Sequence, residues 1–162
     1  MKPGNILAFK INNNTTNFFS KAISLISRFT VGNWLPNNDS YSHVSILAEE
    51  LDMHYELTWP RGGKNRIKWD KYDVYQVVHN DLTNEKRQQI LEFCRTKAHK
   101  YRYDWLCIIT FGLLRLSNNA SVCSRFVGDA YAAVGINLRK KSEKLLSPNE
   151  IAHNPNVKIK KI

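Results

Sequence analysis

The sequence predicts a mixed fold in which helices and strands form one domain. Short apolar segments are typical of strands, and longer segments place their apolar residues on one helical face. The chain has 162 residues, of which 43% are hydrophobic and 23% are charged, as in ordinary globular proteins with a single core. No internal repeat or long linker interrupts the chain, so we expect one domain over residues 1–162.

Strands are expected in four segments. In the clearest one, Tyr55 and Leu57 alternate with His54 and Glu56, so the two pairs point to opposite faces of a sheet. The Gly-Gly pair that follows this segment indicates a turn. The four expected strands are residues 6–11, 43–48, 53–59 and 73–78.

Helices are expected in four further segments. The most informative is residues 122–134, for which Ser121 is the expected N-cap and Gly135 the residue that ends the helix. This assignment places Cys123 in the first turn. The four expected helices are residues 16–29, 81 or 83 to 99, 103–116 and 122–134.

The chain is strongly basic, with 24 lysines and arginines against 14 acidic residues and a net charge of +10. Such a charge favours anionic partners, namely nucleic acid, anionic lipid or a cell wall. Nucleic acid is the least favoured, because the basic residues are scattered and no nucleic-acid-binding motif is visible. We expect a soluble protein that is cytoplasmic at synthesis, since neither a signal peptide nor a membrane-spanning segment is visible.

The three cysteines, Cys94, Cys107 and Cys123, cannot all pair, and none has CxxC spacing. This pattern argues against both a disulfide scaffold and a zinc knuckle. The five histidines are dispersed and no HExxH motif occurs, so we expect no metal site. No cofactor is expected either, because no glycine-rich phosphate loop follows a strand. Cys94 and Cys107 fall inside apolar helical patterns and are expected in the core.

Cys123 is the candidate nucleophile. A helix N-terminus lowers the pKa of a thiol, and the amides of the first turn can bind the oxyanion that forms on attack. His43 opens a strand and is the candidate base. On the next strand, Glu56 and His54 share one face, and either can hold the far nitrogen of the His43 ring. We choose Glu56, because a carboxylate also stabilises the imidazolium.

Several segments, taken in order, resemble one protein superfamily. The superfamily is the circularly permuted NlpC-type papain-like proteins (the YiiX-like branch). The resembling segments correspond, in chain order, to the family's opening segment, its helix and Ser-His-Val strand, the Glu of the next strand, a Tyr-Asp pair, the Cys-Ser turn and the closing segment. The likeness extends over nearly the whole chain. The segments are Pro3-Gly4-Asn5-Ile6-Leu7, Phe29-Thr30, Tyr41-Ser42-His43-Val44-Ser45-Ile46, Tyr55-Glu56-Leu57, Tyr103-Asp104, Val122-Cys123-Ser124 and Leu146-Ser147-Pro148-Asn149-Glu150-Ile151.

The resemblance implies an α+β fold, the permuted papain-like fold, with an antiparallel sheet packed against helices and the histidine ahead of the cysteine in the chain. It also implies hydrolysis or transfer of an acyl group through a thioester. The chain differs from the family in three places. Asn5 replaces an Asp, Arg125-Phe126 stands where Glu-Leu is common, and the insert over residues 64–71 is unusually basic.

We therefore expect a cysteine peptidase or amidase that cleaves a peptidoglycan peptide or another anionic amide substrate, delivered to the wall by a phage particle or by lysis. The expected catalytic triad is Cys123, His43 and Glu56. The residues expected to bind substrate are Tyr41, Ser124, Lys64 and Arg66.

Two alternatives remain open. One is a lipid acyl hydrolase or acyltransferase on the same fold, with Trp59 and Trp69 at an anionic membrane surface. The other, from a different class, is a binding or structural module without catalysis. A thiol-reactive reagent separates the enzyme from the module, because an enzyme should react selectively at Cys123.

Overall fold

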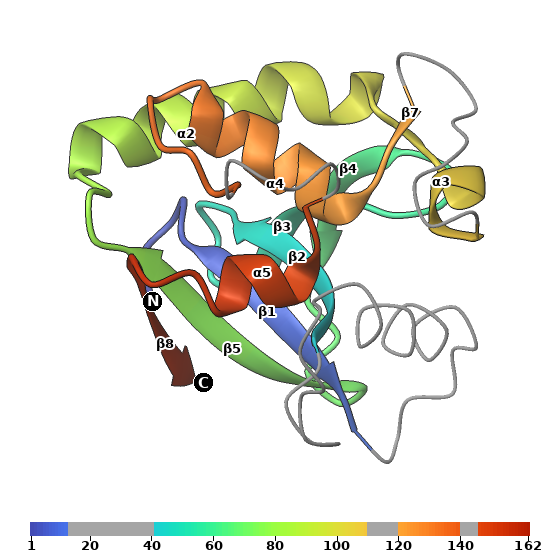
Figure 1. Cartoon of the computed structure of the whole chain (residues 1–162), viewed down its shortest axis with the longest axis horizontal. Helices are drawn as coiled ribbons and strands as arrows, with labels where there is room; N and C mark the ends of the chain where they lie inside the picture. The colour runs from blue at the N-terminus through green and yellow to red at the C-terminus, as the bar shows by residue number, and fades with distance from the viewer. Residues whose placement is uncertain (13–40, 110–119, 140–145) are drawn as a thin grey trace.

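The computed structural model describes residues 1–12, 41–109, 120–139 and 146–162 (Figure 1). The helix expected over residues 16–29 lies outside these ranges, as does the later part of the helix expected over residues 103–116. Within the described ranges the protein combines an antiparallel sheet with short and medium helices, which confirms the expected α+β class.

A six-stranded sheet forms the centre of the protein, in the order β4-β3-β2-β1-β5-β8. Every neighbouring pair in it is antiparallel. The apolar strand β1 lies in the middle, as expected for a strand covered on both faces. The strands are β1 Ile6–Ile11, β2 Tyr41–Leu47, β3 Met53–Leu57, β4 Gly62–Arg66, β5 Tyr72–His79 and β8 Val157–Lys161, and a separate parallel pair is formed by β6 Arg102–Tyr103 and β7 Ala120–Ser121.

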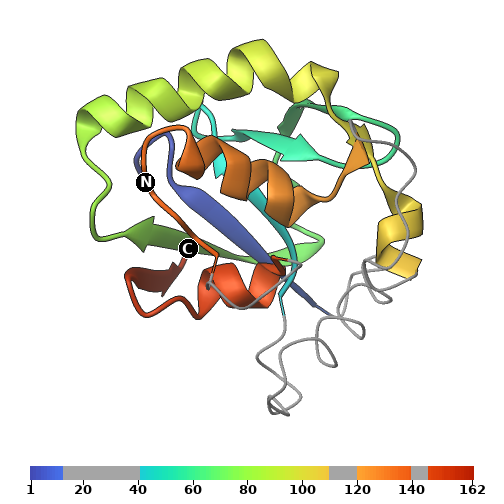
Figure 2. The same ribbon diagram turned by 45° about the horizontal axis from the view of Figure 1, so that its top comes forward.

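The helices are α2 Asn84–Lys97, the 3-10 helix η1 Ala98–Lys100, α3 Trp105–Ile109, α4 Cys123–Ala132 and α5 Pro148–Ala152. Figure 1 shows α4 and α5 lying in front of the sheet, with α2 alongside α4. Seen with its top turned forward, the molecule shows α2 running along the upper border and α4 crossing in front of β1 (Figure 2).

The main core lies between these helices and one face of the sheet. Phe126 and Ala130 of α4 are fully buried in it together with Val44 and Ile46 of β2 and Ile90 of α2. Burial of such side chains contributes about 1.5–3 kcal/mol each for the larger ones. The N-terminal turn of α4 is thereby fixed against β2.

A smaller apolar cluster lies on the other face of the sheet and includes Leu7, Phe9, Leu47 and Val74. Phe9 is the direct cross-strand partner of His43 in the β1–β2 ladder. Directly opposed residues project from the same face. The His43 side chain therefore leaves β2 on the face of the sheet that carries this smaller cluster.

Two side-chain contacts fix the ends of the elements around β2. Ser147 and Glu150 form a capping box that starts α5, which satisfies amides that a helix N-terminus leaves unpaired. Asn149, in the same turn, accepts a hydrogen bond from the Tyr41 N–H at 2.7 Å. This contact attaches α5 to the first residue of β2, two positions before His43.

The structure corrects three expectations. Residues 62–66 form the edge strand β4, whereas the sequence predicted a turn at the Gly-Gly pair and a basic insert after it. The strand was missed because its sequence, GGKNR, has no apolar side chain. The C-terminal strand β8 was not expected. Ser121 belongs to β7, so the N-cap of α4 is Val122, which has no capping side chain. Gly135 has φ +76°, as expected for the end of α4.

Candidate active site

Cys123 is the first residue of α4 and is only 3% exposed. Because Val122 offers no capping side chain, the amides of the first turn are open to the thiol, and the Ser124 N–H donates a hydrogen bond to the sulfur. A second N–H, that of Val44 on β2, also donates to it. The sulfur thus lies between the helix start and the backbone of β2, among groups that favour the thiolate.

The pairing of β2 with β3 explains how the helix start approaches the sheet. The ladder comprises only Ile46 with Tyr55 and Leu47 with His54. Toward the beginning of β2 the two strands are no longer paired, and this is where Val44 contacts the Cys123 sulfur. The His43 ring hydrogen-bonds to the same sulfur, although the two residues are far apart in the sequence.

Glu56 of β3 is the partner of His43 on its other side. Its Oε2 lies 2.8 Å from His43 Nε2, and both side chains are mostly buried, at 15% and 19% exposure. The second oxygen, Oε1, accepts a hydrogen bond from Asn65 Nδ2 at 3.0 Å. Asn65 comes from the edge strand β4. The sequence did not identify it, because its segment was interpreted as an insert.

His54, the alternative third residue, takes a different place. Its Nδ1 lies 2.7 Å from Ser45 Oγ, and its Nε2 lies 3.6 Å from Glu56 Oε1. The Phe9 ring contacts both imidazoles, with ring centroids 5.5 Å from His43 and 5.5 Å from His54. Of the two candidates for the third residue, Glu56 is the one that hydrogen-bonds to the His43 ring.

The pKa values of these groups follow from burial and from their neighbours. Burial lowers the pKa of His43, but the Cys123 thiolate and then Glu56 outweigh it and raise the pKa to about 10. Burial raises the pKa of Cys123, but the His43 charge and hydrogen bond and the two backbone N–H groups bring it below its usual range. Burial also raises the pKa of Glu56, whereas its contacts to His43 lower it to about 2. Together these shifts favour a thiolate–imidazolium pair beside a carboxylate.

No protein-family model and no curated protein sequence matches this chain.

Tyr103 is a further residue near the sulfur. It is buried, and burial followed by the charges of Cys123, Cys107 and Glu56 raises its pKa. Tyr103 belongs to β6, which pairs with β7 immediately before α4. In the sequence, Tyr103 stood out only as part of the Tyr-Asp pair that resembles the family.

The four residues expected to bind substrate lie in two kinds of place. Tyr41 and Ser124 are buried; the Tyr41 ring packs edge-on against Tyr75, with centroids 5.4 Å apart, and the Ser124 hydroxyl donates to the Leu146 carbonyl. The basic pair lies near acids: Lys64 Nζ is 2.5 Å from Glu50, and Arg66 Nε is 3.2 Å from Asp52. Substrate binding by these four residues stays a prediction.

The other two cysteines lie in the core. Cys94 and Cys107 are buried, and no disulfide joins them. Burial raises the pKa of Cys94 far above its ordinary value, so its thiol remains protonated.

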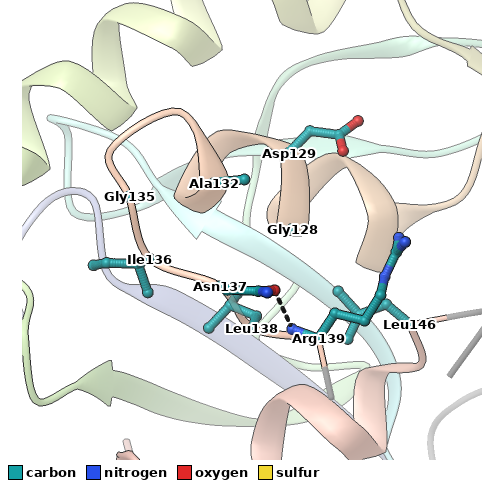
Figure 3. Close-up of a pocket in the computed structure, with 9 residues that line it drawn as sticks. All are labelled: Gly128, Asp129, Ala132, Gly135, Ile136, Asn137, Leu138, Arg139 and Leu146. Atoms are coloured by element: carbon teal, nitrogen blue, oxygen red, sulfur yellow. Dashed lines mark hydrogen bonds between the residues drawn. The ribbon is translucent and has the colours of Figure 1, made fainter. Parts of the chain in front are cut away.

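A cavity of about 400 Å³ lies beside the second half of α4 and the loop that follows it (Figure 3). Asp129 and Arg139 supply its charged groups, and Gly128 of α4 forms part of its wall. None of its lining residues belongs to the Cys123 site, so we assign it no part in the chemistry there.

Within the four described ranges, no group of three or more His, Cys, Asp or Glu side chains is arranged to hold a metal ion. In the same ranges, every helix is too short or too polar to cross a bilayer.

Proposed function

We propose that this protein is a cysteine hydrolase that cleaves an amide bond through a thioester, on a permuted papain-like fold. The observation that carries the proposal is the chain of contacts from Cys123 at the start of α4 to His43 and on to Glu56. A thiol held as a thiolate beside an imidazolium is the arrangement that acyl-transfer chemistry requires. Cys94, by contrast, is buried in the core, and its burial raises the pKa of its thiol far above the ordinary value.

The reaction follows from the positions of these groups. The Cys123 thiolate attacks the carbonyl carbon, and the developing oxyanion is stabilised by the Cys123 backbone N–H at the helix start. The His43 imidazolium donates its proton to the leaving nitrogen, so the C–N bond breaks, the amine leaves and a thioester remains. Neutral His43 then takes a proton from water, the hydroxide adds to the thioester, and the acid departs as the thiolate and imidazolium are restored.

For the substrate, we propose a peptidoglycan peptide. The net charge of +10 supports an anionic target, since the wall carries carboxylate and phosphate groups. A second candidate, a lipid acyl group, is favoured by two exposed tryptophans: Trp59 is 70% exposed and Trp69 is 41% exposed. Exposed tryptophans are typical of surfaces that enter a membrane interface.

The nucleophile is tested with iodoacetamide and peptide mapping by mass spectrometry. Cys123 should be alkylated well before Cys94 and Cys107, and His43→Ala should slow its alkylation near neutral pH by about 10-fold or more. Equal reaction of all three cysteines would favour the non-catalytic module. Release of amines from purified peptidoglycan, compared with release of fatty acid from anionic phospholipid vesicles, then separates the two substrate classes.

A further inference from the structure

His54 and Ser45 form a buried pair directly behind the carboxylate of Glu56. Ser45 is fully buried and His54 is 4% exposed. Their polar atoms are 2.7 Å apart, and the other nitrogen of the His54 ring faces Glu56 Oε1 at 3.6 Å. Burial of these two polar side chains costs desolvation, which their mutual hydrogen bond offsets in part.

The neighbours of His54 determine where its ring proton resides. A neutral imidazole carries one donor and one acceptor. If Nδ1 held the proton, the lone pair of Nε2 would face the carboxylate oxygen of Glu56, which is repulsive. The favourable arrangement has the Ser45 hydroxyl donating to Nδ1 and the Nε2–H directed at Glu56.

We propose that His54, held in this form by Ser45, is a positioning residue that aims the Glu56 carboxylate at His43; this inference rests on the proposed function. At 3.6 Å the His54 contact is longer than a hydrogen bond and acts by electrostatic attraction. Asn65 makes the hydrogen bond to the same oxygen, at 3.0 Å. Together they hold Oε1, so that Oε2 is left facing His43 Nε2.

The charges around His54 agree with a neutral ring. The charged groups that act on it are Glu56 on its own strand, His43 on β2 and Lys68 after β4. Burial lowers the pKa of His54 to about 4, with His43 and Lys68 acting in the same direction and Glu56 opposing them. A neutral His54 adds no second positive charge beside the His43 imidazolium.

The test is an NMR titration of the His43 ring in the whole protein, which needs no substrate. His54→Leu keeps most of the side-chain volume but removes the N–H that faces Glu56, so the pKa of His43 should fall by about one pH unit. His54→Gln can place an amide N–H near the position of Nε2, so it should return the pKa of His43 most of the way to the wild-type value. Ser45→Ala, a smaller change, should lower the pKa of His43 in the same direction.

His79→Leu is the matched control. His79 is equally buried, at 4% exposure, but lies on β5 beside Asp81, so its loss should leave the His43 titration unchanged. A His43 pKa unaltered in both His54→Leu and Ser45→Ala, with both variants folded, would overturn the positioning role. Iodoacetamide alkylation of Cys123 in the same samples keeps the two proposals apart, because rapid alkylation with an unmoved His43 pKa refutes the positioning role alone.

Discussion

Glu56→Gln removes the negative charge beside His43 while keeping the size of the side chain. The two oxygens of Glu56 accept from His43 at 2.8 Å and from Asn65 at 3.0 Å. A glutamine amide has only one oxygen, so when that oxygen accepts from His43, its NH₂ group meets Asn65, whose exposed amide has to turn before it can accept. The variant therefore loses the charge and disturbs the contact with Asn65.

The magnitude follows from this contact. An opposite charge at such a distance in a mostly buried site shifts a pKa by about 1–3 units. Each unit corresponds to about 1.4 kcal/mol, so the thiolate–imidazolium pair should lose about 1.4–4 kcal/mol. Because this pair is the reactive state of Cys123, turnover of Glu56→Gln should fall by about 10- to 1000-fold.

The assay is turnover of the amide substrate by Glu56→Gln, with the pKa of His43 measured by NMR in the same variant. Glu49→Gln is the control, because Glu49, in the turn between β2 and β3, also has a basic partner, Arg95 at 2.9 Å, but does not contact His43. Thermal melting checks that both variants are folded. Glu56 is no part of the mechanism if the turnover of Glu56→Gln stays within about twofold of wild type and the pKa of His43 stays within about 0.3 units.

Three further predictions follow from the site and the fold. Cys123→Ser should abolish turnover and iodoacetamide labelling at this position while changing the melting temperature little, since the residue volume is nearly kept; turnover at the wild-type rate would end the enzyme hypothesis. Because the folded-state pKa of His54 is lowered from 6.5 to about 4, the unfolded chain binds its proton first, so stability is lost as pH falls from about 6.5 to 4, by on the order of 3 kcal/mol. Denaturant melts at pH 7 and pH 4.5 measure this loss, and His54→Gln should show a smaller one; equal losses would mean that His54 does not titrate as described. Gly62→Ala should destabilise the fold by several kcal/mol, because a Cβ there would lie 2.4 Å from the Ala98 carbonyl oxygen, whereas Gly63→Ala meets nothing within 4 Å and should cost less than about 1 kcal/mol; urea melts of the two variants should differ accordingly, and equal midpoints would contradict the close approach.

Local patterns in the sequence were enough to place the principal reactive groups. Helical periodicity put Cys123 at the start of a helix, and strand alternation put Glu56 and His54 on one face. Both features depend on neighbours within a few residues, so they are visible without the fold. The choice between the two side chains depended on a chemical argument, and the 2.8 Å contact of Glu56 with His43 agrees with it.

The remaining parts of the site depend on contacts between distant segments. Asn65 was missed because a short polar edge strand has no apolar alternation, and its contact with Glu56 exists only once β3 and β4 pair. The Val44 N–H reaches the Cys123 sulfur because β2 and β3 stop pairing at that point, which no local pattern shows. For Lys64, the sequence displayed a basic cluster but not the partner Glu50 that faces it.

The crossing from β5 to α2 divides the chain into two chemically incomplete halves. His43, Glu56 and Asn65 precede the exposed residues Asn80 and Asp81, whereas Cys123 follows them. On the proposed mechanism, the first half holds the base and its orienting groups, and the second holds the thiol at the start of α4 without the His43 ring that completes its ionisation. On the proposed function, cutting the chain at this loop should give two inactive fragments, and hydrolysis of the substrate should return only when the fragments associate. If the proposed hydrolysis is found, the order of these residues along the chain suits a split enzyme in which returning activity reports assembly.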